Sequence, residues 1–158
     1  MAKKSRFNPA AFAMTSLAAP AIAVVVFMVG MVIAELVQNG VGVRPPPVGG
    51  FILTLVMIAL WGWIPSAVFG GAVLGLVLSC VPAPSWRTLG PAGILAAALY
   101  VLAGLGTFAV HPSLSYLFAP WASGGPNLHD PLFWTIPGSI VLAGGLAGLM
   151  YARFAKRG

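Results

Sequence analysis

The stretch Ala11–Val37, AFAMTSLAAPAIAVVVFMVGMVIAELV, decides what kind of fold this chain can adopt. It is predominantly apolar, and no charged residue occurs between Arg6 and Glu35. About 20 apolar residues in a helix cross the ~30 Å hydrocarbon core of a bilayer. Backbone groups in that core must bond within their own segment, and the stretch lacks the alternation of a β-strand. It therefore predicts a membrane-spanning helix.

The remaining charges of the chain are spaced in the same way. Of the 158 residues, 59% are hydrophobic and only 6% are charged, whereas about a quarter of the residues in a soluble domain are charged. Long intervals without charge also separate Arg44, Arg87, Asp130 and Arg153 from one another. We therefore expect an all-α membrane protein, a bundle of about four transmembrane helices that forms a single domain over residues 1–158.

The apolar intervals predict where these helices begin and end. Asn8-Pro9 has the composition of a helix start, with Asn as the cap and Pro at the first helical position. Residues 111–130 are rich in aromatic side chains and prolines, a composition typical of a segment at the outer membrane interface. The expected spans are residues 11–37, 49–81, 91–110 and 131–152.

The second apolar stretch, residues 49–81, permits two interpretations. As one helix it measures roughly 50 Å, which exceeds the thickness of the hydrocarbon core. Pro65 lies near its middle, and proline removes a backbone donor and clashes with the preceding turn. The stretch is therefore either one long helix kinked at Pro65 or a re-entrant segment over residues 49–62 followed by a separate span.

The basic residues favour four crossings. Four spans place both chain ends on one side, together with every Lys and Arg except Arg44. Because cytoplasmic loops carry the excess of Lys and Arg, we expect both ends in the cytoplasm and the protein in a bacterial inner membrane. The net charge of +6 does not indicate nucleic-acid binding, since no basic stripe with interleaved aromatics occurs. The chain-end basic residues are Lys3, Lys4, Arg6, Arg153, Lys156 and Arg157.

Small residues recur at helical spacing in the second and fourth spans. Gly71 and Gly75 are four residues apart, as are Gly144 and Gly148, so each pair lies on one helix face. Helices in lipid associate where small residues let their backbones approach closely. These pairs are therefore helix-contact faces, either inside one chain or against a partner or a second copy.

The ionisable residues that are not basic gather on the predicted outer side, as Glu35, His111, His129 and Asp130. Glu35 ends the first span, where it either pairs with Arg44 or handles protons or cations. Two histidines and a carboxylate are possible metal ligands. However, Asp130 precedes Pro131 as a helix cap does, and adjacent His129 and Asp130 lack helical ligand spacing. We therefore expect no metal site.

The sequence contains no complete catalytic, metal or cofactor motif, so we expect neither an enzyme nor a cofactor. The leading hypothesis is a small polytopic membrane protein that acts as an accessory or scaffolding subunit. Its expected partners are membrane lipids and either other membrane protein subunits or a second copy of itself. The alternative is a small homo-oligomeric channel or transporter that uses Glu35 and the glycine faces.

Overall fold

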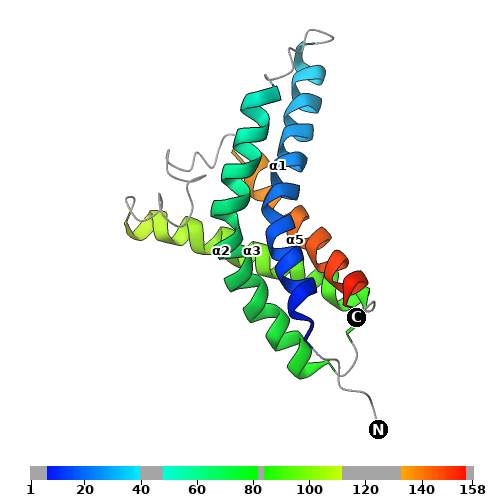
Figure 1. Ribbon diagram of the computed structural model, residues 1–158. Helices are drawn as coiled ribbons and strands as arrows, with labels where there is room; N and C mark the ends of the chain where they lie inside the picture. Colours follow the sequence, from blue (N-terminus) through cyan, green and yellow to red (C-terminus); the bar gives the residue numbers. More distant parts are fainter. Residues whose placement is uncertain (1–6, 40–47, 82–83, 112–132, 156–158) are drawn as a thin grey trace.

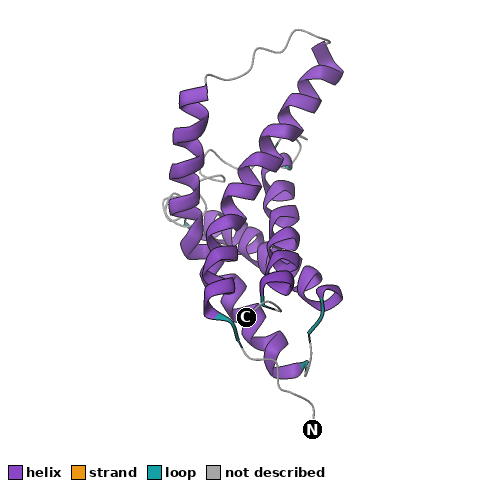
Figure 2. Cartoon of the chain, turned by 45° about the vertical axis from the view of Figure 1, so that its right-hand side comes forward, coloured by secondary structure: helices purple, strands orange, loops and turns teal. Residues whose placement is uncertain are grey.

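The computed structural model describes residues 7–39, 48–81, 84–111 and 133–155 (Figure 1). All regular structure in these ranges is helical (Figure 2). The helices are α1 (Pro9–Asn39), α2 (Val48–Cys80), α3 (Trp86–Val110) and α5 (Thr135–Phe154). Each holds a segment long and apolar enough to cross a membrane, namely Pro9–Ile33, Trp61–Cys80, Trp86–Val110 and Thr135–Phe154. The expectation of an all-α protein with four membrane-length helices is therefore confirmed.

Local hydrogen bonds explain where α1 and α3 begin. Asn8 caps α1 as predicted, because its Oδ1 accepts the Ala11 N–H at 3.0 Å. The third helix begins at Trp86, earlier than the start expected near Pro91. There the Ser85 N–H donates to Thr88 Oγ1 at 2.9 Å, which satisfies a backbone donor ahead of the helix. The helix continues through Pro91, which only removes one donor from its second turn.

The second and fourth apolar stretches also differ from the expected boundaries. Helix α2 runs without interruption from Val48 through Pro65 to Cys80. Helix α5 begins at Thr135. The expected start at Asp130-Pro131 and most of the interfacial segment 111–130 lie outside the described residues.

The four helices do not all run alongside one another. Helices α1 and α2 lie side by side, whereas α3 runs across α2 and α5 packs between α1 and α3 (Figure 1). Contacts join α3 to α5, α1 to α5, α1 to α2, and α2 to α3. The result is two crossed pairs of helices rather than four parallel rods.

The buried apolar cluster lies where the start of α1, the end of α2, the start of α3 and the end of α5 meet. Tyr151 is only 5% exposed there, although it carries a hydroxyl group. Away from this cluster, large apolar side chains cover the outer surface, as lipid contact requires. The cluster consists of Ala11, Leu74, Leu89, Tyr151 and Ala152.

Backbone contact between α3 and α5 depends on glycine. A Cβ atom at Gly144 would lie 2.5 Å from the Cβ of Ala97 and would also collide with the carbonyl oxygen of Gly93. A Cβ at Gly93 would meet the Gly144 carbonyl, and one at Gly148 would meet the Leu89 carbonyl. The face formed by Gly144 and Gly148 is therefore occupied within the chain, by α3.

Smaller contacts of the same kind hold α2 against α1. A Cβ at Gly62 would lie 2.5 Å from Pro20 Cβ, and one at Gly71 would lie 3.3 Å from Phe12 Cζ. A Cβ at Gly75 would meet no described atom within 4 Å. Gly71 and Gly75 therefore differ, because the first faces α1 and the second lies on the open side of α2.

We predict that Gly144→Ala destabilises the protein, whereas the matched variant Gly138→Ala in the same helix does not. The added methyl at Gly144 has no space, and overpacking costs about 1–3 kcal/mol. A Cβ at Gly138 meets no described atom within 4 Å, so alanine gains helix propensity of up to about 1 kcal/mol there. Thermal unfolding in detergent measures both. Equal melting temperatures for the two variants would contradict the α3–α5 contact.

Candidate functional site: the basic end of the bundle

A hydrogen bond joins the two chain ends of the described structure. The Asn8 backbone N–H donates to Tyr151 Oη at 3.2 Å, across 143 positions of sequence. The Tyr151 ring fills the apolar cluster, while its hydroxyl reaches the polar start of α1. Tyrosine suits this position because one end of its side chain is apolar and the other is polar. The start of α1 and the end of α5 therefore lie at the same end of the bundle.

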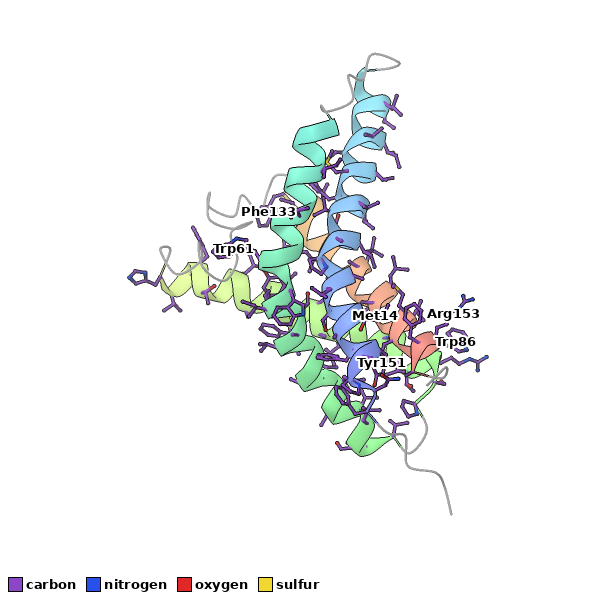
Figure 3. The ribbon with its side chains drawn as sticks, in the orientation of Figure 1. Met14, Trp61, Trp86, Phe133, Tyr151 and Arg153 are labelled. Carbon is purple, nitrogen blue, oxygen red and sulfur yellow. The ribbon has the colours of Figure 1, made fainter. Side chains whose placement is uncertain are left out.

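The antiparallel register of α3 and α5 brings Trp86 and Arg87 to that same end. Gly93 lies against Gly144, and Leu89 lies one turn nearer the end against Gly148. Continued by a further turn, this register places the start of α3 beside Arg153. Figure 3 shows Trp86 and Arg153 at the same corner of the bundle.

The side chains at this corner are exposed and interact with one another. Arg87 Cζ lies 5.3 Å from the centroid of the Trp86 ring, which is a cation–π distance. Trp86 is 56% exposed, and both Arg87 and Arg153 are exposed. Arg153 in the last turn of α5 complements the negative end of its helix, whereas Arg87 lies at the positive end of α3. The Arg87 side chain and the helix dipole therefore both make the start of α3 electropositive.

Four hydroxyl groups of the described helices donate to carbonyls of their own helix. Thr15 donates to the Ala11 carbonyl at 2.9 Å, and Ser139 donates to the Thr135 carbonyl at 2.6 Å. The same holds for Thr107 with the Gly104 carbonyl at 2.9 Å, and for Ser79 with the Leu76 carbonyl at 2.8 Å. These hydroxyls use their protons within the helix backbone, which is common for Ser and Thr in apolar helices.

The candidate residues of the outer side are not assembled within the described structure. Glu35 belongs to α1, but its side chain lies outside the description, and Arg44, His129 and Asp130 lie outside the described residues altogether. His111 follows α3, is exposed, and donates its backbone N–H to the Thr107 carbonyl at 2.9 Å. Figure 1 shows the ends of α1 and α3 well apart, because α3 runs across the first helix pair.

Metal and redox sites are the remaining possibilities for chemistry at this surface. Among the described residues, no group of three His, Cys, Asp or Glu side chains is close enough to hold a metal ion. Cys80 is a free, exposed thiol whose sulfur lies 3.7 Å from Ser79 Oγ.

Two features of the site were missed from sequence. The sequence predicted neither the hydrogen bond of Tyr151 nor the close contact at Gly93. A tyrosine two residues before Arg153 could have indicated a side chain at the membrane interface. Its partner Asn8 could not be inferred, because it is too distant in sequence. Comparison with protein-family models, with curated proteins and with solved structures found no match for the chain.

Proposed function

We propose that this protein is a multi-pass protein of the bacterial inner membrane that acts as a non-enzymatic accessory or scaffolding subunit. It packs its outer faces against lipids and other membrane proteins. One observation carries the proposal: Thr15, Thr107 and Ser139 donate their hydroxyl protons to carbonyls of their own helices, and the helices present large apolar side chains outward. A surface of this kind suits contact with apolar partners and offers a solute few polar groups.

The outward side chains are distributed over the whole bundle. Val68 of α2 is 60% exposed and Leu102 of α3 is 62% exposed, and α1 and α5 carry Val29 and Leu142 with similar exposure. In water, such a surface would favour aggregation. In a membrane it is covered by acyl chains or by the small-residue and apolar faces of other helices.

The orientation follows from the charge. The start of α1 and the end of α5 meet at one end of the bundle. Every basic residue of the chain except Arg44 either lies at that end or is close in sequence to a residue that does. We place this end in the cytoplasm on the positive-inside rule.

We also propose that α2 bends at Pro65. A helix of 33 residues is roughly 50 Å long, which is too long for an upright span. The bend lets its first half follow α1, where Gly62 packs against Pro20.

The bend predicts that Pro65→Ala lowers the melting temperature in detergent, because straightening α2 pulls Gly62 away from Pro20. Pro47→Ala, which precedes the helix, should leave the melting temperature nearly unchanged. If α2 is instead straight, Pro65→Ala removes a proline penalty of about 3 kcal/mol and the melting temperature rises. That increase would contradict the bend.

Glu35→Gln separates the accessory subunit from the alternative, a homo-oligomeric channel or transporter that uses this carboxylate. An interfacial carboxylate paired with Arg44 contributes under about 1 kcal/mol, so the variant should insert, retain its co-purifying partners and complement a deletion strain. Arg44→Gln is the matched control, and it should insert, retain its partners and complement the deletion as Glu35→Gln does. A transport residue cannot be replaced in this way, because the amide does not bind and release a proton. Loss of complementation by Glu35→Gln with assembly intact would establish the transporter instead.

A further inference from the structure

We propose that Arg87 and Arg153 form a binding site for the phosphate of an anionic phospholipid, with the Trp86 indole beside it at the headgroup level. The inference rests on the proposed membrane insertion and names a specific lipid partner for the basic end.

Helical spacing places the two arginines on the same flank of the α3–α5 contact. Leu149 of α5 packs against Gly90, and Ile94 of α3 packs against Gly145, so these two side chains mark one flank. Arg153 follows Leu149 by four residues, and positions four apart share a helix face. Arg87 precedes Ile94 by seven residues, two turns along the face of α3. Both cations therefore project from this flank at the basic end.

The chain offers few acidic residues to pair with these arginines. It contains only two acidic residues. Glu35 lies toward the far end of α1, and Asp130 precedes α5, whose other end carries Arg153. The positive end of the α3 helix adds to the charge of Arg87 rather than opposing it. Two cations on one flank favour an anion from outside the chain, and arginine binds phosphate oxygens well.

An apolar stripe leads away from the cations and favours a lipid over a free phosphate. Leu142, Leu146 and Leu149 are exposed at helical spacing along α5, and the next residue on this face is Arg153. An acyl chain lying along the stripe places its phosphate at the arginine. The exposed Trp86 indole belongs at the same depth, since amphipathic rings collect at the headgroup level. An inorganic phosphate would contact neither the apolar stripe nor the indole ring.

The test measures binding of phosphatidylglycerol to the purified full-length chain in neutral detergent, by counting lipid adducts in native mass spectrometry and by thermal shift. Phosphatidylglycerol should bind and raise the melting temperature, whereas phosphatidylcholine should not. Each arginine near a membrane surface contributes about fivefold to the affinity for anionic lipid, so Arg87→Gln with Arg153→Gln should weaken binding about 30-fold. Arg44→Gln is the matched control for each single variant, Arg87→Gln or Arg153→Gln, because it removes one positive charge elsewhere and should leave the affinity unchanged.

Three results would overturn the inference. If Arg44→Gln weakens binding as much as Arg87→Gln or Arg153→Gln alone, only net charge matters. Displacement of the lipid by millimolar inorganic phosphate would assign the site to a free anion. Leu146→Ser should also weaken phosphatidylglycerol binding. If that variant binds as tightly as the unchanged protein, the acyl chain does not lie along α5. A chain that inserts into vesicles but fails these tests leaves the proposed function standing, whereas a chain that does not insert refutes both.

Discussion

The close approach of α3 and α5 at Gly93, Gly144 and Gly148 is the contact on which the rest of this structure depends. In lipid there is little hydrophobic drive between helices, so association relies on close packing of backbones. Glycines at these positions leave the facing backbones free to touch. The resulting antiparallel register brings the start of α3 to the end of α5. The buried cluster, the Tyr151 hydrogen bond and the corner with two arginines all follow from that register.

The concentration of positive charge at one end connects the packing to the proposed role. Tyr151 links the last helix to the start of the first, so the basic segments before α1 and after α5 adjoin the same end of the bundle. In the proposed lipid site, anionic headgroups supply the counter-charge for this end. The other end and the sides present apolar side chains. These features are what the proposed accessory subunit needs: charges that anchor one end and apolar faces that contact neighbouring helices.

The sequence predicted the four membrane-length helices and the Asn8 cap, because charge-free apolar runs and capping residues act locally. It did not predict which helices pair. Helical spacing showed that Gly144 and Gly148 share a face, but the partner Gly93 depends on how two distant segments cross. Because α3 runs across α2, the ends of α1 and α3 lie apart, although both were expected on one side of the membrane. The charges of a sequence predict on which side of the membrane a residue lies. Which residues of one side lie close together depends on tertiary packing.

The claim that four crossings place both basic ends in the cytoplasm is tested most directly by cysteine labelling of the full-length chain in cells. Cys80 is the only cysteine, so a Cys80→Ser background carries single cysteines at Gly158 or at Gly125. A membrane-impermeant thiol reagent added outside should label the cysteine at position 125 in intact spheroplasts. The cysteine at position 158 should react only after the membrane is opened. Labelling of both positions from the same side would contradict the four-crossing arrangement.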